Sequence, residues 1–380
     1  MPGSQQRSRC RIACFVTPHG FGHATRAAAV LTELAGRLPI VVDIYGAVPP
    51  RLFAQSLDCP FSCRPLTTDV GFVQHSPVEE DLPATLASLK RLLPFDEALV
   101  ETLAAELRQR DCRLVLCDIA ALGIAVARRA GIPSVLVENF TWDWVYAGYL
   151  GQCPGLAPHR QYLHDLYQLA DHRVQTEPVC APRADAHRVG LICRAPRLTR
   201  EELRRQLAVG QEQSLVLVTM GGIGGGVPHE ALRGRPQTIF LLPGGRGAES
   251  WQDNLRLLPA EGRWYHPDLA TASDLIVGKL GYSTLAEACQ AGTPFAVIGR
   301  PHFPESAVLA EYAEKRLAVR ELAADAFASG RWLDELPGLL RLERGTPVRE
   351  RGAAEVAELV RGWLDCAGLG AGFGLGGQTT

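Results

Sequence analysis

The stretch Pro18-His-Gly-Phe-Gly-His-Ala-Thr-Arg26 follows an apolar run at residues 12–16 and precedes apolar residues at helical spacing from Ala27 to Leu34. A strand, a glycine turn and a helix in this order aim backbone N–H groups and a helix dipole at an anion. A second such unit lies far along the chain, where Gly278-Lys-Leu-Gly-Tyr-Ser-Thr284 follows the apolar residues 275–277. Two units in separate halves indicate a ligand with a phosphate part, held between two domains.

Short β-rich runs alternate with helical patterns in both halves of the 380-residue chain. A chain of this length exceeds the roughly 250–300 residues of a single hydrophobic core, so we expect two domains. The alternation predicts a parallel, doubly wound α/β sheet in each domain. The expected strands are 12–16, 40–44, 114–117, 134–137, 215–219, 237–242, 275–277 and 295–298, and the expected helices are 24–36, 84–108, 121–130, 159–170, 283–291, 304–315 and 349–364.

A charged stretch from Arg194 to Arg205 interrupts this alternation, and Thr199 with Glu202 has the spacing of a capping box that starts a helix. We therefore expect a domain boundary near residue 193. The predicted organisation is a first domain at 10–193, a second at 194–348, an amphipathic helix at 349–364 that packs back on the first domain, and a disordered, glycine-rich tail at 367–380.

The composition is that of a globular protein, with 47% hydrophobic and 21% charged residues. A net charge of −2 without a basic stripe argues against nucleic-acid binding. Residues 1–9 are polar and no apolar run approaches the ~18 residues of a membrane helix, so we expect a cytoplasmic protein with reduced cysteines. Of the 39 basic residues only three are lysines, and one of them, Lys279, lies in the second glycine turn.

His23 is expected at the carboxyl end of the first strand, where open α/β sheets hold ligands. An imidazole there could take a proton from a hydroxyl near neutral pH, or His23 could merely begin the helix. Asp118, which ends the strand at 114–117, could orient that imidazole, cap the helix at 121–130, or do both. The spacing of His19 and His23 would suit zinc on a helix, but the glycines between them disfavour a helix and no third ligand is evident.

In the second half, the glycine run at 221–226 follows a predicted strand. It could let the backbone approach a diphosphate, or it could be a plain turn. Ser283 and Thr284 could hold phosphate oxygens at a helix start, with Glu287 accepting hydrogen bonds from ribose hydroxyls. Alternatively, Thr284 and Glu287 are only a capping box.

Aromatic residues concentrate at 138–146, just past a predicted strand end. They could form an interface or a peripheral membrane contact, or they could stack on the face of a sugar. His302 and Glu305 follow the strand at 295–298 and could face the same cleft, or could lie in a solvated loop.

Together these motifs resemble the two-domain glycosyltransferases of the GT-B fold, the group that contains MurG and the UDP-glycosyltransferases. A narrower resemblance is to the N-terminal, glycosyltransferase-like half of plant arabinokinases and its stand-alone bacterial relatives. It covers about residues 10–365 and implies two Rossmann-like domains that face each other across a cleft. The motifs that carry it are His19–Arg26, Gly71-Phe-Val-Gln74, Asn139-Phe-Thr-Trp-Asp143 and Lys279-Leu-Gly-Tyr-Ser-Thr284.

The resemblance implies an inverting glycosyltransferase that uses a nucleotide-sugar donor, which we expect to be UDP-linked, and an acceptor hydroxyl of unknown identity. His23 corresponds to the catalytic base and Asp118 to the aspartate that orients it. The implied donor-binding residues are Gly221, Gly222, Gly224, Tyr265, His266, Lys279, Gly281, Ser283, Thr284, Glu287 and Glu305. The implied residues facing the acceptor or the sugar are His19, Gly22, Gln74, Asn139, Trp142 and Asp143.

Pro304-Glu305 stands where relatives have an Asp-Gln or Gln-Gln pair for the donor sugar, so the sugar itself is not implied. The kinase half of arabinokinases has no counterpart in these residues, so no sugar-kinase activity is implied. No Asp-x-Asp pair is present, so we expect a reaction without a metal or another cofactor. The alternatives are a UDP-sugar epimerase or hydrolase of the same fold and a non-catalytic, regulatory nucleotide-sugar-binding protein, whereas a dehydrogenase is disfavoured because the dinucleotide fingerprint fails.

Overall fold

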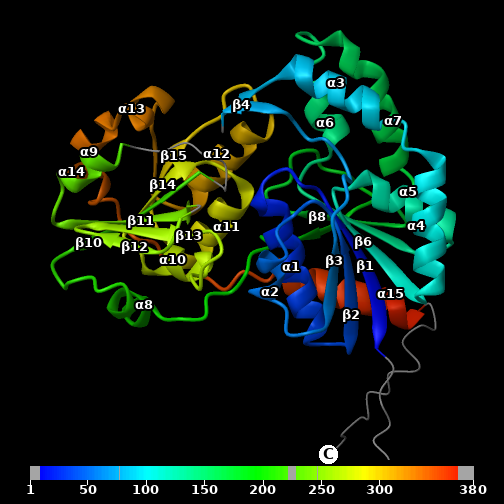
Figure 1. The fold of residues 1–380 in the computed structure, drawn as a ribbon, viewed down its shortest axis with the longest axis horizontal. Helices are drawn as coiled ribbons and strands as arrows, with labels where there is room; N and C mark the ends of the chain where they lie inside the picture. Colours follow the sequence, from blue (N-terminus) through cyan, green and yellow to red (C-terminus); the bar gives the residue numbers. More distant parts are fainter. Residues whose placement is uncertain (1–8, 77, 221–227, 246, 367–380) are drawn as a thin grey trace, which may run out of the picture.

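The computed structural model has two α/β lobes, each built on one large twisted sheet (Figure 1). It describes residues 9–76, 78–220, 228–245 and 247–366. The glycine run at 221–226 and the expected tail at 367–380 therefore lie outside the described residues. Within the described ranges, no helix combines the length and the apolar composition that crossing a bilayer requires.

The first lobe contains a seven-stranded sheet with the order β3-β2-β1-β6-β7-β8-β9, in which all pairings are parallel. Its strands are β1 (Cys10–Val16), β2 (Ile40–Tyr45), β3 (Phe61–Arg64), β6 (Cys112–Asp118), β7 (Ser134–Glu138), β8 (His172–Thr176) and β9 (His187–Val189). Its helices are α1 (Phe21–Ala35), α2 (Arg51–Ala54), α3 (Leu82–Leu92), α4 (Glu97–Gln109), α5 (Ala121–Ala130), α6 (Trp142–Ala147) and α7 (Ala157–Tyr167), and a short hairpin pairs β4 (Gln74–Ser76) with β5 (Glu79–Glu80).

The second lobe repeats this plan, with the strand order β12-β13-β11-β10-β14-β15-β16. Only the edge strand β12 is antiparallel to its neighbour among the described pairings. The strands are β10 (Ser214–Thr219), β11 (Thr238–Gly245), β12 (Ser250–Gln252), β13 (Leu255–Pro259), β14 (Leu275–Lys279), β15 (Phe295–Ile298) and β16 (Val319–Glu321). The helices are α8 (Arg200–Gln206), α9 (His229–Arg233), α10 (His266–Ala272), α11 (Tyr282–Ala291), α12 (Glu305–Arg316), α13 (Ala324–Ser329) and α14 (Leu336–Leu339).

Both sheets are covered by helices on both faces, which confirms the predicted pair of doubly wound α/β units. In the first lobe, α1 packs on one face and α4 and α5 on the other, and the strands between them alternate side chains toward the two cores. In the second lobe, α10 and α11 cover one face while α13 and α14 cover the other. Because helices cover both faces, the carboxyl ends of the strands are where open sheets of this kind hold ligands.

The predicted strands are all present, but the expected helix at 84–108 is wrong. Two helices, α3 and α4, occupy this stretch, because Pro94 lies between them and lacks the N–H that a continuous helix needs. The capping box of Thr199 and Glu202 is confirmed: Oγ1 of Thr199 accepts from the N–H of Glu202, and the Glu202 carboxylate accepts from the N–H of Thr199.

The carboxyl-terminal helix α15 (Gly352–Cys366) returns from the second lobe and lies along the first (Figure 1). Val356 and Val360 of α15 are fully buried against the core beneath α1. The returning segment also contacts the outgoing one, because the N–H of Gly352 donates to the carbonyl of Leu191 at 3.1 Å and the N–H of Gly190 donates to Oε2 of Glu355 at 2.8 Å. The two crossings between the lobes are thus bonded to each other.

Strand register determines which residues lie side by side at the strand ends that precede the two glycine turns. Val16 at the end of β1 pairs with Asp118 at the end of β6. In the second lobe, Thr219 pairs with Gly278, and a Cβ at Gly278 would lie only 1.8 Å from the carbonyl oxygen of Thr219. Glycine is therefore required at 278 for β10 and β14 to come together.

Candidate functional site

Two adjoining cavities lie between the lobes. The larger has a volume of about 750 Å³ and is lined by α1, α2 and the amino ends of α10 and α11, among other segments. The smaller has a volume of about 640 Å³ and lies over the glycine turn of the first lobe and the strand ends of the second. Four residues line both cavities, and they come from both lobes: Phe21, Gly22, Ser283 and Thr284.

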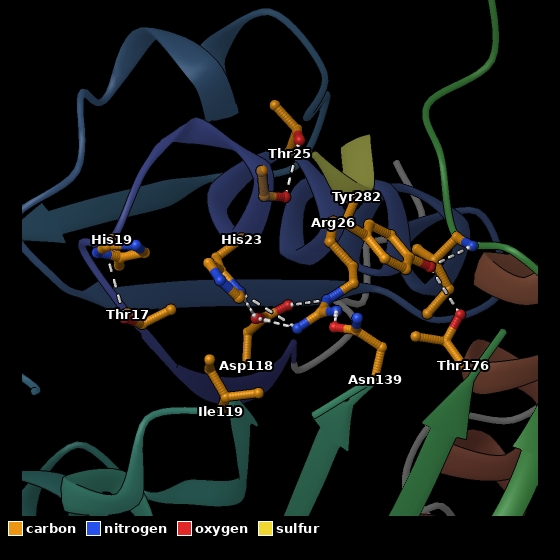
Figure 2. Close-up of polar contacts among 12 residues, drawn as sticks. Thr17, His19, His23, Thr25, Arg26, Asp118, Ile119, Asn139, Thr176 and Tyr282 are labelled. Atoms are coloured by element: carbon orange, nitrogen blue, oxygen red, sulfur yellow. Dashed lines mark hydrogen bonds and ion pairs between the residues drawn. The ribbon is translucent and has the colours of Figure 1, made fainter. Parts of the chain in front are cut away.

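His23 and Asp118 form a buried pair at the wall of the smaller cavity. Nδ1 of His23 lies 2.8 Å from Oδ1 of Asp118 (Figure 2). Gly20, with a φ of +79°, lets the chain turn from β1 into α1, so that His23 falls in the first turn of the helix. The alternative that Asp118 caps α5 is wrong, because α5 begins at Ala121 after Ala120, with no side-chain cap.

Arg26 holds the same carboxylate from the next turn of α1. Its Nε donates to Oδ2 of Asp118 at 2.7 Å and its Nη2 donates to Oδ1 at 2.7 Å, a two-pronged geometry that fits a carboxylate (Figure 2). Its Nη1 donates to Oδ1 of Asn139 at 2.6 Å. The guanidinium is only 2% exposed and lies 5.0 Å from the ring centre of Tyr282 in the second lobe.

Asp118 and Arg26 both contact Nδ1 of His23, so these two contacts decide its tautomer. Burial raises the pKa of Asp118, but the Arg26 charge and the hydrogen bonds from His23 and Arg26 outweigh it and hold the pKa below its ordinary value. An ionised carboxylate only accepts hydrogen bonds, and Oδ1 of Asp118 lies closer to Nδ1 of His23 (2.8 Å) than the donor Nη2 of Arg26 does (3.2 Å), so we assign the hydrogen to Nδ1 and the lone pair of the neutral ring to Nε2. That lone pair gives His23 the chemistry of a base at the cavity wall.

The amino end of α11 forms the opposite wall. The helix begins at Tyr282 after Gly281, with no side-chain cap, so the alternative of a capping box at Thr284 and Glu287 is wrong. Ser283 and Thr284 lie in its first turn, where backbone N–H groups have no partner within the helix. Both residues line both cavities, so an anion bound at this helix end would lie where the two cavities adjoin.

Glu287 lies one turn further along α11 and lines the larger cavity. Its Oε1 accepts from Nη2 of Arg194 at 3.2 Å, and its Oε2 contacts Nδ1 of His266. Burial raises the pKa of Glu287. The charges and hydrogen bonds of His266 and Arg194 lower it by a larger amount, so the net pKa lies below its ordinary value. Tyr265 does not line this cavity, since its ring lies under Arg194 and Arg197, at 4.7 and 4.2 Å.

Lys279 ends β14 and lines the smaller cavity together with Arg300 and Gly281. Its Nζ makes no hydrogen bond or ion pair within the part of the chain that the structure describes. Burial, followed by the nearby Arg300 charge, lowers the pKa of Lys279 to about 7, although Glu305 and Glu80 act in the opposite direction. This wall of the cavity therefore disfavours the charged form of Lys279 in the free protein, and an anion bound beside it would favour that form.

Glu305 also lines the smaller cavity, but both of its carboxylate oxygens have partners. Oε1 accepts from Nδ2 of Asn139 in the first lobe at 2.8 Å, and Oε2 lies 3.4 Å from Nη2 of Arg300. Its position therefore links the lobes. His302 is exposed and lines neither cavity, so the alternative that it faces the cleft is wrong.

The aromatic segment at 138–146 turns inward. Trp142 is fully buried among Phe72, Phe140 and Tyr146, so the predictions that it faces a sugar, or that the segment forms an exposed membrane-touching patch, are wrong. Edge-to-face and stacked contacts between aromatic rings stabilise this buried arrangement. His19 lines the smaller cavity, with its ring 5.1 Å from that of Trp142.

Two further acceptor predictions are wrong for reasons of placement. Asp143 points to the other side of α6, where its Oδ2 lies 2.9 Å from Nδ1 of His164 and it lines a separate cavity within the first lobe. Gln74 lies in the β4–β5 hairpin and lines neither cavity between the lobes. Gly22, by contrast, lines both, and Asn139 is buried between Arg26 and Glu305.

Sequence reasoning missed three residues that organise the site: Arg26, Arg194 and Tyr282. The spacing of Arg26 from His23, three residues along one helix, was a usable signal that both lie on the same face. No comparable signal existed for Arg194, which lies outside any regular element and meets Glu287 only in the folded chain. Across the described residues, no group of three or more His, Cys, Asp and Glu side chains is arranged to hold a metal ion.

Comparison with known proteins gives one curated relative and many solved structures. L-arabinokinase of Arabidopsis thaliana is 28% identical over 343 residues, which are 87% of this chain and 32% of that protein. The chain thus spans about a third of the length of the curated relative that it matches. It matches no protein-family model.

Two solved structures are similar over nearly their whole length. The calicheamicin glycosyltransferase CalG4 gives a TM-score of 0.60 at 15% identity, with 94% of this chain and 99% of that chain covered. Medicago truncatula UGT71G1, solved as a complex with UDP-glucose, gives a TM-score of 0.55 at 13% identity, with 94% and 95% covered. At these identities the similarity establishes the fold.

Proposed function

We propose that this chain, which has the two-lobed GT-B fold of its structural neighbours, is a glycosyltransferase that moves a sugar from a nucleotide donor to an acceptor hydroxyl. One observation carries the proposal: His23 of the first lobe, which contacts Asp118, and the amino end of α11 in the second lobe line the same cavity. A base on one wall and an anion site on the other are what displacement of a diphosphate by a hydroxyl requires.

The donor is assigned to both cavities. Its nucleoside occupies the larger one, where Glu287 accepts hydrogen bonds from the ribose and the backbone of His266 reads the base. Its diphosphate lies at Ser283 and Thr284, which border both cavities, and its sugar lies in the smaller one. The similarity to a protein solved with UDP-glucose supports a uridine nucleotide. Contacts from Gly221, Gly222 and Gly224 to the diphosphate remain predictions.

The proposed reaction is a single inverting displacement. The acceptor oxygen attacks the anomeric carbon of the sugar while Nε2 of His23 takes its proton, and the bond from that carbon to the diphosphate oxygen breaks with its electron pair on the diphosphate. Asp118 accepts the Nδ1–H bond throughout and stabilises the imidazolium. The N–H groups of α11 and the charge of Lys279 stabilise the leaving diphosphate. No step needs a divalent ion, so chelation with EDTA leaves the rate unchanged.

The donor is identified first, by thermal shift against UDP-, GDP- and dTDP-sugars, because a ligand that binds only the folded form raises the melting temperature. Product analysis with that donor and an acceptor panel then compares wild type with His23→Ala. Loss of a general base lowers kcat by about 10²–10⁴-fold. His159→Ala, on α7, is the matched control.

The outcomes separate the alternatives. Near-normal turnover in His23→Ala would show that His23 is not the catalytic base. Donor breakdown or isomerisation without an acceptor would replace the transferase with a hydrolase or an epimerase. Donor binding with no product under any condition would make the protein a nucleotide-sugar sensor.

A further inference from the structure

A chain of directed hydrogen bonds runs from His23 through the first lobe into the second. Nδ1 of His23 donates to Asp118, which also accepts two bonds from Arg26. Arg26 donates onward to the side-chain oxygen of Asn139, and the side-chain nitrogen of Asn139 donates to Oε1 of Glu305. Along this path each donor meets an acceptor, and a competing contact is that of the donor Nη2 of Arg26, 3.2 Å from Nδ1 of His23.

Every member of the chain is withdrawn from water. His23 is 9% exposed and the other four residues are 4% exposed or less. A buried charge or amide that loses its partner costs far more than one at the surface, so the arrangement is strongly preferred over its alternatives. The orientation of Asp118 is therefore set by Arg26, and that of Arg26 depends on Asn139 and Glu305.

Arg26 makes a second contact with the opposite lobe. The ring of Tyr282 lies 5.0 Å from its guanidinium, a cation–π arrangement, and Tyr282 is itself held by Thr176 and by the N–H of Ile192. The guanidinium thus contacts the carboxylate that orients the base on one side and Tyr282 of α11 on the other, and it is linked to Glu305 of α12 only through Asn139.

From this geometry we infer that Arg26 is a positioning residue, which makes the orientation of the His23 imidazole depend on the seating of the second lobe. When Tyr282 and Glu305 are in place, the guanidinium holds Asp118 where it accepts the Nδ1–H of His23. When the second lobe moves away, Asn139 and Arg26 lose their outer contacts, and the carboxylate is no longer held in one orientation. The base is therefore complete only in the closed molecule, in which the donor is enclosed.

The mechanistic importance of this inference rests on the proposed function, but its test does not. The imidazole nitrogens of ¹⁵N-histidine-labelled protein report the tautomer directly, with no substrate present. In wild type we expect the His23 signal of a ring with hydrogen on Nδ1 and a bare Nε2. In Arg26→Met and in Asn139→Ala we expect a mixture of tautomers, with Arg26→Lys intermediate because one ammonium cannot reproduce the two-pronged contact.

The control is Arg110→Lys. Arg110 contacts Asp43 with the same two-pronged geometry, Nε to Oδ2 at 3.0 Å and Nη2 to Oδ1 at 2.6 Å, in the same lobe and away from both cavities. The groups that face His23 and could also affect its signal are His19, Asp118 and Arg26, so His19→Gln is measured as well. We expect neither Arg110→Lys nor His19→Gln to change the tautomer of His23.

Kinetics supply the second measurement. Misplacement of a base lowers kcat by roughly 10²-fold, and KM for the donor changes little because Arg26 does not line the larger cavity, to which the nucleoside is assigned. If Arg26→Met fails to fold, Asn139→Ala carries the test, since it removes one amide and leaves both charges of the Arg26–Asp118 pair in place. An unchanged His23 tautomer in Asn139→Ala would overturn the inference even if transferase activity is found, and a mixed tautomer would support it even if none is found.

Discussion

The hydroxyl of Tyr282, in the second lobe, lies 2.8 Å from the hydroxyl of Thr176, at the end of β8 in the first. Thr176 donates its own hydrogen to the carbonyl of Gly190 at 2.8 Å, so Tyr282 is the donor in the contact between them. Tyr282 in turn accepts from the N–H of Ile192 at 3.0 Å. One buried phenol therefore joins α11, β8 and the connection between the lobes.

Removing that phenol hydroxyl leaves the N–H of Ile192 buried without its partner. We expect Tyr282→Phe to lower the free energy of unfolding by about 1–3 kcal/mol. Denaturant unfolding measures this, and a double-mutant cycle with Thr176→Val isolates the contact. Additive effects of the two substitutions would mean that the two hydroxyls contribute independently.

Lys279 carries a cost in the free protein that its substitution should relieve. Its pKa is about 7 in the folded chain against an ordinary 10.5, so between these values the unfolded chain binds a proton that the folded chain does not. The free energy of unfolding therefore rises with pH across this window. Below about pH 7 the stabilisation gained across the window is absent. We expect Lys279→Met to raise the melting temperature near neutral pH and to flatten its pH dependence, while weakening UDP binding.

The matched control for this prediction is Lys315→Met. Lys315 is exposed and pairs with Glu311 at 2.6 Å on the surface of α12, so its loss should change neither stability nor UDP binding measurably. A Lys279→Met protein that is less stable than wild type at neutral pH would show that the lysine is compensated in the free site.

Glu287 should matter for both stability and ligand binding. It and Arg194 are each 4% exposed, so Glu287→Gln leaves a buried guanidinium without its carboxylate. We expect a loss of about 3–5 kcal/mol of stability by denaturant unfolding and a smaller thermal shift with UDP. Because the pKa of Glu287 is lowered in the folded chain, wild type loses this contribution as pH falls through that lowered value, and the variant does not.

Here Glu311→Gln serves as the comparison, since it alters an exposed carboxylate of the same lobe. It should leave the thermal shift with UDP unchanged. An equal UDP shift in Glu287→Gln and wild type would remove Glu287 from the nucleotide site.

Gly278→Ala is expected to prevent stable folding of the second lobe. The added Cβ would meet the carbonyl oxygen of Thr219 at 1.8 Å, and backbone on both sides leaves no side chain to give way. Gly362→Ala, in the middle of α15 with nothing within 4 Å, should instead stabilise the protein by about 0.5–1 kcal/mol. Soluble yield and melting temperature distinguish the two, and a folded Gly278→Ala would show that β10 and β14 can separate.

The sequence predicted those parts of the site that depend on strand ends. His23 and Asp118 follow neighbouring strands of a parallel sheet, so their meeting could be anticipated from the alternation of elements alone. The direction in which a side chain leaves a loop could not be. Trp142 and Asp143 follow a strand end as expected, yet the first is in the aromatic core and the second faces α7.

Strands with polar buried residues were also hidden from the sequence. β8 reads His-Arg-Val-Gln-Thr, which has no apolar pattern. Its polar residues Arg173 and Gln175 can be buried because both donate hydrogen bonds to Glu138 on the neighbouring strand β7. A pairing of this kind is visible only once the two strands are adjacent. The same holds for Asn139 and Glu305, which are 166 residues apart in the chain.

The bonds that join Gly190 and Leu191 to the start of α15 have a consequence for how the molecule can open. Two separate connections could bend independently of each other. Two connections that are hydrogen-bonded to each other instead act as one hinge between the lobes. We therefore expect the second lobe to rotate about this hinge when the cavities between the lobes open. A crosslink between the lobes far from that hinge would block the rotation, and a crosslink beside the hinge would permit it.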